Sequence, residues 1–545
     1  MRIVLVLLLA ATLAPAQSFR TRKTLRPGYD VARWKLLTAS GTDTAQFILV
    51  GGDGSVKSWL DFDAAPVGDL VLPQAARTLL AWENVLAENA RSQLIAISPG
   101  GAVAYRADER GVFQAKGESL ARRARFRLRV GDPTFAGVVQ DINEDGKLDL
   151  VVPGSDRTDV WVQTPKGFRR TARIEVDVDR FDTLNGTALS NDLSTTFRIP
   201  NLRTSDVNGD GRPDLLVKSG RVRAFHLQRE DGSFPAEPDV TLDLRIFRDT
   251  TPKAALRPGR TLAGGDRQRY ESRDLDGDGI PDYVIAHRRK VWVFHGNKNK
   301  PQFTEPTTIL KVSDDITALV LVKLDEDEFP DMVLLKVQVP SAAGVVAGLV
   351  RGLEVEADAL GYASEGGKGF ARSPGWRSTI TLKLPKLTKV LKDPGKIIER
   401  IEEAGRKFRL RRFDDFNGDG LDDTLLLSED GQRIDYWKGN RKIEAVEQVI
   451  DFGQTVRRIL FEDENKSWDL ERILQFVSGT ANELTETLTD GRVPDATLTF
   501  RDPAKFRRVD FATGDLDGDG RAEIVVRYAP VDRPEDAIFD IIELR

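Results

Sequence analysis

Five short segments of this 545-residue chain repeat one pattern of acidic residues and glycine. The pattern is Asp-x-(Asp/Asn)-x-Asp-Gly-x-x-(Asp/Glu), followed at once by an apolar run. A tight loop of this kind points the side chains at positions 1, 3 and 5 inward, and glycine at position 6 permits the sharp turn. Gathered oxygen donors suit a hard cation, so the sequence predicts about five sites for Ca²⁺.

The candidate ligands fall at equivalent positions of the five loops. Positions 1, 3, 5 and 9 offer side chains, and position 7 offers its backbone carbonyl. Metal-free Asp/Gly turns are the alternative, but so many facing carboxylates would repel one another without a cation. From position 1 to position 9, the ligands are Asp141, Asn143, Asp145, Lys147, Asp149; Asp206, Asn208, Asp210, Arg212, Asp214; Asp274, Asp276, Asp278, Ile280, Asp282; Asp415, Asn417, Asp419, Leu421, Asp423; and Asp515, Asp517, Asp519, Arg521, Glu523.

A sixth copy of the pattern begins at Lys323 and is degraded. It has lysine at position 1 and Glu328 in place of the glycine, although Asp325, Asp327 and Asp331 remain. We interpret it as a failed site in which the ammonium of Lys323 replaces the cation. A metal at this loop is the less favoured alternative.

The residues after each loop indicate a strand rather than a helix. An EF-hand needs a bidentate Glu at position 12, where this chain has Val152, Val217, Ile285, Leu426 and Val526. Short β-prone runs lead through turns into second strands, which predicts hairpins. Similar hairpins without a loop occur upstream, at residues 47–60 and 94–105.

With the hairpin of the degraded copy, which begins at residues 332–335, the count reaches eight, and it predicts an all-β fold, a β-propeller of eight blades with short helical insertions. Seven blades are the alternative, in which a strand around residues 31–37 completes the C-terminal unit.

The loops resemble FG-GAP (VCBS-type) repeats, the units of the integrin α-subunit N-terminal propeller. Phe135-Ala136-Gly137 and Phe511-Ala512-Thr513-Gly514 loosely fit the segment that precedes the loop in that family. The resemblance covers roughly residues 30–545. It implies that each loop joins two strands of a blade and holds Ca²⁺ through positions 1, 3, 5 and 9.

The N-terminal residues are typical of a secretory signal. Arg2 precedes an apolar stretch at residues 3–13, and Ala14-Pro15-Ala16 supplies the small residues of a cleavage site. We therefore expect a signal peptide at residues 1–16 and a secreted or periplasmic propeller domain at 17–545. The apolar stretch is too short to span a bilayer, so we expect no membrane anchor.

Three insertions interrupt the repeat, near residues 341–352, 386–405 and 463–490. In the third, Leu470, Ile473, Leu474 and Val477 recur at helical spacing, with Trp468 beside them. Packing on the propeller accounts for such a face better than a ligand site does. The lysines near the second insertion are interpreted as a solvated connector, with docking of an acidic partner as the alternative.

Composition narrows the function. The chain has no Cys and three His, which excludes thiol chemistry and most zinc sites. His226, His287 and His295 are interpreted as packing or rim residues. The net charge of -5 offers no overall basic field for nucleic acid.

We expect a monomeric binding or structural module for an extracellular protein or glycan. The alternatives are a polysaccharide lyase or hydrolase on the same scaffold, and a component of a surface adhesin or toxin. No catalytic residues are assigned.

Overall fold

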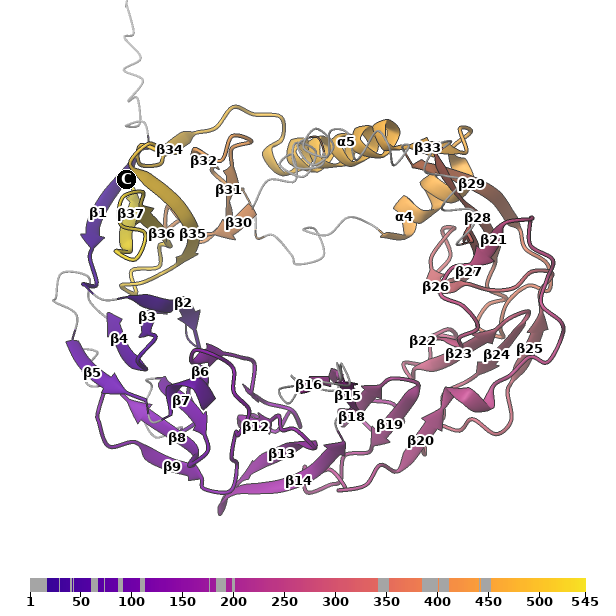
Figure 1. The fold of residues 1–545 in the computed structure, drawn as a ribbon, viewed down its shortest axis with the longest axis horizontal. Coiled ribbons are helices and arrows are strands. Elements are labelled where there is room, and N and C mark those ends of the chain that lie inside the picture. Colours follow the sequence, from indigo (N-terminus) through magenta and orange to yellow (C-terminus); the bar gives the residue numbers. More distant parts are fainter. Residues whose placement is uncertain are drawn as a thin grey trace, which may run out of the picture.

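The described residues of the chain form a ring of β-sheets around a central opening (Figure 1). Eight of these sheets have four or more strands, and a ninth is a two-stranded hairpin. The eight larger sheets are the blades of a propeller, as the hairpin count predicted. The computed structural model describes residues 17–28, 30–39, 42, 44–59, 67–72, 74–86, 92–107, 113–175, 177–182, 193–198, 201–341, 352–384, 400, 411–440, 442 and 452–545.

Each blade is an antiparallel sheet whose principal strands follow one another in the chain, with two exceptions. In blade 7, β33 lies between the third and fourth strands in the chain but pairs with blade 6, and the last blade also takes in β1. From blade 1 to blade 8, these strands are β2 (Val31–Thr38), β3 (Ala45–Gly51), β4 (Ser55–Trp59), β5 (Val67–Val71); β6 (Leu79–Glu83), β7 (Gln93–Ser98), β8 (Gly101–Arg106), β9 (Glu118–Ala121); β11 (Val139–Gln140), β12 (Asp149–Val152), β13 (Arg157–Thr164), β14 (Gly167–Glu175); β17 (Asn201–Ser205), β18 (Asp214–Ser219), β19 (Val222–His226), β20 (Val240–Asp243); β22 (Arg269–Arg273), β23 (Asp282–His287), β24 (Lys290–Phe294), β25 (Thr308–Lys311); β26 (Ala318–Val322), β27 (Asp331–Pro340), β28 (Leu353–Tyr362), β29 (Trp376–Leu384); β30 (Arg411–Asp414), β31 (Asp423–Leu427), β32 (Arg433–Trp437), β34 (Ala496–Thr499); and β35 (Phe506–Gly514), β36 (Glu523–Pro530), β37 (Ile538–Leu544), β1 (Phe19–Leu25).

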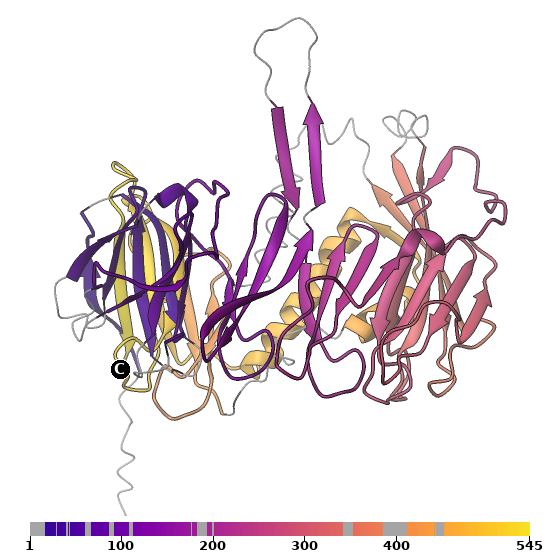
Figure 2. The ribbon, with the colours of Figure 1, turned by 90° about the horizontal axis from the view of Figure 1, so that it is seen from below.

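The remaining elements attach to this frame. β10 pairs in parallel with β6, β21 pairs with β27, and β33 pairs in parallel with β29. β15 and β16 form a hairpin that rises from the ring (Figure 2). These elements are β10 (Thr134–Phe135), β15 (Asp177–Asp182), β16 (Leu193–Arg198), β21 (Arg260–Leu262), β33 (Ser467–Asp469), the 3-10 helices η1 (Ala75–Arg77) and η2 (Leu244–Ile246), the π-helix η4 (Arg458–Glu462), and the helices α4 (Phe452–Arg457) and α5 (Leu470–Thr489).

The second strands of the blades are apolar on both faces because each blade packs between two neighbours. All residues of β3, β7 and β23 are buried. Strands that are buried on both sides appear in a sequence as continuous apolar runs rather than as an alternation. The apolar runs that follow the acidic loops are of this kind, and they therefore predict buried strands.

The two ends of the described chain close the ring together. β1 pairs with β37, so an N-terminal strand supplies the outer edge of the last blade. The strand at residues 31–38, which the seven-blade alternative placed in that unit, instead opens blade 1. Asp540 strengthens the closure, because its buried carboxylate accepts hydrogen bonds from Thr24 at 2.6 Å and from Arg501 at 2.6 and 2.7 Å.

A long helix, α5, lies between blades 6 and 7 (Figure 1). It begins at Asp469, whose side chain accepts the N–H of Arg472 and caps the helix. Trp468 is buried against Phe476, with ring centroids 5.3 Å apart. The expected signal peptide at residues 1–16 lies outside the described residues. So do residues 342–351 of the first insertion and nearly all of the second insertion. Within the described part, no helix is long and apolar enough to cross a membrane.

An aromatic cluster joins the last blade to the first. Phe539 on β37 lies 5.3 Å from Phe47 and 5.4 Å from Trp34, measured between ring centroids, and Phe47 and Phe539 are fully buried. These three side chains come from opposite ends of the chain. Ring closure therefore depends on packing as well as on the β1–β37 hydrogen bonds.

Replacing Phe539 with Ala should lower the free energy of unfolding by about 3–5 kcal/mol, because it leaves a cavity at the junction of blades 1 and 8. Chemical denaturation of the purified protein measures this change. Ile309→Ala is the control, since Ile309 is 47% exposed on blade 5 and its truncation should cost little. Equal losses in the two variants would contradict a closure that depends on this cluster.

Candidate metal centres

The five intact acidic loops occupy the same place in five blades. Each joins the first strand of its blade to the second, and position 9 is the first residue of that second strand. The blades concerned are 3, 4, 5, 7 and 8, and the degraded loop sits at the same place in blade 6. The structure thus confirms that these loops join two strands of a blade.

The carboxylate at position 1 holds the turn together by accepting backbone N–H groups from its own loop. In four loops, one oxygen accepts the N–H of position 4 at 2.6–2.7 Å and the other accepts that of position 6 at 2.6–2.9 Å. In the first loop, Asp141 accepts from Asp145 and Gly146. The aspartate at position 5 accepts the N–H of position 7 in all five loops, at 2.8–3.0 Å.

Two positions of each intact loop lie in the left-handed region of backbone conformation. Position 6 is glycine throughout, with φ between 80° and 83°. Position 4 is glycine in four loops, with φ between 67° and 80°, and is Glu144 in the first, with φ 54°. The sequence pattern identified the glycine at position 6 but not the second left-handed residue at position 4.

The carboxylate at position 9 is buried and ties the loop to the sheet. Its exposed fraction is 0–3% in all six loops, including the degraded one. One oxygen accepts the N–H of position 2, at 2.7–3.1 Å. In five of the loops the other oxygen accepts an N–H near or after the end of the blade's third strand, at 2.7–2.9 Å. This carboxylate is therefore a structural group as well as a candidate ligand.

Position 2 is a second anchor that the sequence pattern did not include. Its side chain is apolar and at most 3% exposed in every loop, so the turn is fixed to the core beneath it. The residues are Ile142, Val207, Leu275, Leu324, Phe416 and Leu516.

Burial disfavours the charged form of the carboxylates at position 9. It raises the pKa of Asp149 and of Asp214 to about 6, and that of Glu523 to about 7. The pKa values of Asp282, Asp331 and Asp423 are also raised, chiefly by burial. The hydrogen bonds from the backbone oppose this rise, while the other carboxylates of each loop add to it.

Two loops bring three carboxylates within reach of one ion. Asp274, Asp276 and Asp278 offer oxygens within 4.8 Å of one another, and so do Asp515, Asp517 and Glu523. The other three intact loops have Asn at position 3, which offers an amide oxygen instead of a carboxylate. Among the described residues, it is in these two predicted ligand sets that three carboxylates lie close enough to share one ion.

His295 lies beside the third loop, which the sequence did not indicate. One of its ring nitrogens lies within 4.8 Å of oxygens of Asp276 and Asp282. The interpretation of His295 as a packing or rim residue is therefore incomplete. His226 and His287 are buried, and they bond to the carbonyl of Pro235 and to the N–H of Asp249, respectively.

Basic side chains contact several of the loop carboxylates. Arg22 on β1 pairs with Asp517, and Lys438 lies 3.0 Å from Asp419. Arg212 pairs with Asp210 within the same loop. These cations balance part of the negative charge at the rim of the loops.

The degraded loop keeps the buried carboxylate at position 9 but not the left-handed turn at positions 4 and 6. Asp331 still accepts the N–H groups of Leu324 and Ser364, at 2.7 and 2.9 Å. Glu326 and Glu328 replace the two glycines, and neither adopts a left-handed conformation. Lys323 is exposed and forms no ion pair with a described residue, so its ammonium does not take the place of a cation here.

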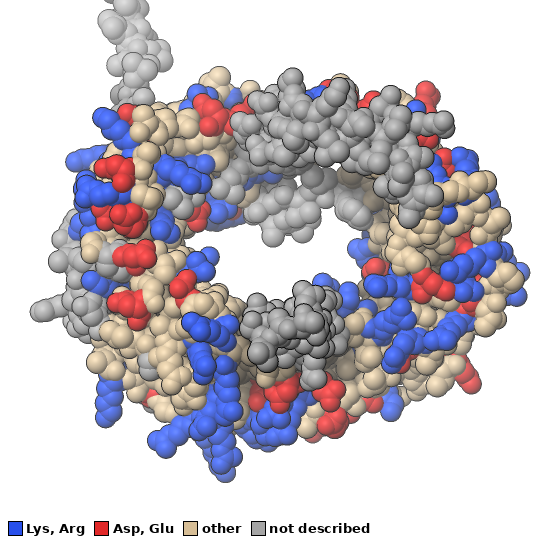
Figure 3. Space-filling view, viewed as in Figure 1, with Lys and Arg blue, Asp and Glu red and all other residues tan. Residues whose placement is uncertain are grey.

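Basic residues also gather away from the loops. Five exposed arginines, here named the arginine stripe, alternate with buried Ala124 and Phe126. The N–H of Phe126 bonds to Ser98 at 3.1 Å, which fixes the stripe to blade 2. Figure 3 shows Lys and Arg side chains gathered at several places around the opening. The stripe consists of Arg122, Arg123, Arg125, Arg127 and Arg129.

The fold and these loops define a β-propeller with acidic, glycine-bearing turns between the first two strands of its blades. Residues 141–217 and 274–334 match the family model of the FG-GAP-like repeat. The chain thus contains FG-GAP-like repeats, as the loop pattern predicted. No curated protein matches the chain.

Solved structures of low similarity include a lectin of Agrocybe aegerita that recognises non-reducing terminal N-acetylglucosamine, at 13% identity and a TM-score of 0.27, with 63% of this chain and 79% of that chain covered. The biofilm matrix protein Bap1 of V. cholerae is 12% identical, with a TM-score of 0.24 and coverage of 94% and 88%. Similarities of this degree say nothing about what this chain binds.

Replacing Asp331 with Ala should lower the free energy of unfolding by about 2–5 kcal/mol, because the buried N–H of Leu324 and the half-buried N–H of Ser364 lose their acceptor. The loss should be the same with Ca²⁺ and with chelator, since this loop lacks the turn that gathers ligands. Chemical denaturation under both conditions tests this. Lys323→Gln is the control and should change nothing, whereas a loss confined to the calcium-loaded protein would show that the degraded loop holds metal.

Proposed function

We propose that this propeller is an exported, calcium-stabilised binding module for an extracellular protein or glycan. The observation that carries the proposal is the shared construction of the five intact loops. Each combines left-handed residues at positions 4 and 6, a position 1 carboxylate that accepts at least two N–H groups of its own loop, and a buried carboxylate at position 9. Five independent metal-free turns would have no reason to agree in all three.

The donor set fits Ca²⁺ in particular. Side-chain oxygens of positions 1, 3, 5 and 9, together with the carbonyl of position 7, supply the hard ligands that this ion prefers. The buried carboxylates at position 9 are held in a setting that raises their pKa, and a nearby cation would favour their charged form. We assign His295 no ligand role, because oxygen donors complete the pattern of its loop without it.

Calcium would supply stability and charge rather than chemistry. An ion that binds the folded chain and not the unfolded chain stabilises the fold by mass action. Five Ca²⁺ ions add ten positive charges, which changes the net charge of the full chain from -5 to about +5. The surface that a partner meets would then be more basic than the sequence suggests.

Export and a binding role rest on separate observations. The signal-like residues 1–16 support an exported protein. Outside the cell even weak calcium sites would be filled, since extracellular modules bind this ion at about 10⁻⁴–10⁻³ M. A binding role is supported by the FG-GAP-like repeats and by a ring with a central opening (Figure 3). No observation favours the lyase or hydrolase alternative over this one.

Calorimetric titration of the chelator-treated protein should show about five calcium sites, and calcium should raise the melting temperature. At a free concentration 100-fold above its Kd, each bound ion adds about 2.7 kcal/mol to stability. Asp276→Ala should remove one site, because this carboxylate lies in the third loop with two others within 4.8 Å.

Asp325→Ala is the matched control, since both residues hold position 3 and accept one N–H at 3.2 Å. It should leave the stoichiometry and the calcium-dependent rise in melting temperature unchanged. A melting temperature that does not respond to chelation would overturn the calcium proposal. Binding screens with glycan and protein libraries, with calcium and with chelator, then test the proposed role.

A further inference from the structure

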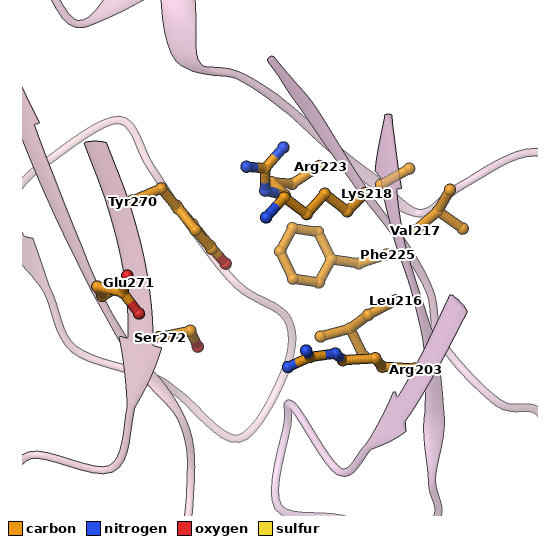
Figure 4. A pocket seen from close by; sticks show the side chains of 10 residues that line it. Arg203, Leu216, Val217, Lys218, Arg223, Phe225, Tyr270, Glu271 and Ser272 are labelled. Atoms are coloured by element: carbon orange, nitrogen blue, oxygen red, sulfur yellow. The ribbon is translucent and has the colours of Figure 1, made fainter. Parts of the chain in front are cut away.

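A cleft between blades 4 and 5 lies apart from the acidic loops. Its volume is about 260 Å³, and β17, β18 and β19 line one side of it while β22 lines the other. Figure 4 shows Arg203, Lys218 and Arg223 on one side of the space, with Tyr270 opposite them. The cleft is small beside a typical drug-sized pocket, so it suits a ligand of about one sugar ring.

Three cations share the blade 4 face of this cleft. Lys218 and Arg223 are direct cross-strand partners, as are Arg203 and Leu216. Like charges that are directly opposite in a sheet destabilise it. Among the described residues, none of the three cations forms an ion pair with a carboxylate, although Glu271 also lines the cleft. Glu271 interacts electrostatically with all three, but one carboxylate against three cations leaves a net positive charge that an anion in the cleft would offset.

Contacts with the backbone and with Tyr270 fix the Arg223 side chain, and one of its N–H donors is left without an acceptor. Its Nη1 donates to the carbonyls of Gly220 and Val222 at 3.0 and 2.9 Å, and its guanidinium lies 4.9 Å from the ring centroid of Tyr270. Its Nε is buried and has no hydrogen-bond partner. A buried donor without an acceptor is destabilising unless a ligand or a water satisfies it.

The rest of the lining offers both apolar and polar contacts. Leu216 and Phe225 lie on the same face of blade 4 as the cations, because Leu216 pairs with both Phe225 and Arg203. Ser272 and Glu271 offer polar groups from blade 5. We infer that this cleft binds a small organic anion, whose carboxylate or sulfate lies among Arg203, Lys218 and Arg223 while its body contacts Leu216, Phe225 and Tyr270.

The test compares glucuronate, inorganic sulfate and neutral glucose by calorimetric titration at constant ionic strength. Glucuronate should bind more tightly than sulfate, and glucose should not bind measurably. Lys218→Gln should weaken glucuronate binding about tenfold or more, because a charge-assisted contact is lost. The same substitution should raise the melting temperature in anion-free buffer, because it relieves the repulsion between Lys218 and Arg223.

Arg127→Gln is the matched control, since it removes one exposed arginine of the arginine stripe and leaves the cleft intact. It should change neither glucuronate binding nor the melting temperature. The inference is overturned if glucose binds as well as glucuronate, or if Lys218→Gln binds glucuronate like the wild type. Sulfate binding as tightly as glucuronate would also overturn it, because the body of the ligand would then contribute nothing.

Discussion

A buried carboxylate at the start of a strand is the interaction on which each loop-bearing blade depends. It receives the N–H of the loop's second residue and, in five of six blades, an N–H near or beyond the end of the third strand. One side chain thereby connects a turn, the strand that follows it and the end of the next strand. Burying a carboxylate is costly, so hydrogen bonds and, as proposed, a cation must offset the loss of water.

The degraded loop separates the two roles of this carboxylate. Asp331 keeps both hydrogen bonds although the residues around it no longer form the left-handed turn. The anchoring role therefore survives without the geometry that gathers ligands. In the intact loops, left-handed residues at positions 4 and 6, which are glycine except for Glu144, let the backbone fold around position 1, and this turn is what makes a cation site chemically reasonable.

Charge is distributed unevenly over this frame. Acidic groups concentrate in the loops, and basic groups gather in the arginine stripe and in the cleft between blades 4 and 5. Because the loops would be neutralised by calcium, the basic regions would dominate what a partner meets. With calcium bound as proposed, the formal charge of the chain would describe its surface less well than local arrangements such as that of Arg203, Lys218 and Arg223 do.

Local patterns in the sequence determined the loops, the strands after them and the hairpins. The spacing of Asp, Asn and Gly fixes a turn within nine residues, and a continuous apolar run specifies a strand buried on both faces. Eight hairpins, six of them following such a turn, were enough to predict the propeller. The anchoring of position 2 could also have been noticed, since an apolar residue stands there in every copy.

Tertiary structure alone decided which distant residues meet. The pairing of β1 with β37 joins strands more than 500 residues apart, and it settled which strand completes the last blade. The approach of His295 to the third loop, the exposure of Lys323 and the meeting of Arg223 with Tyr270 depend on how strands and blades pack, which no local spacing encodes. Consecutive residues determine the chemistry of each loop, because its donors lie within nine positions of one another. The closure of the ring and the cleft between blades form only when separate blades pack together.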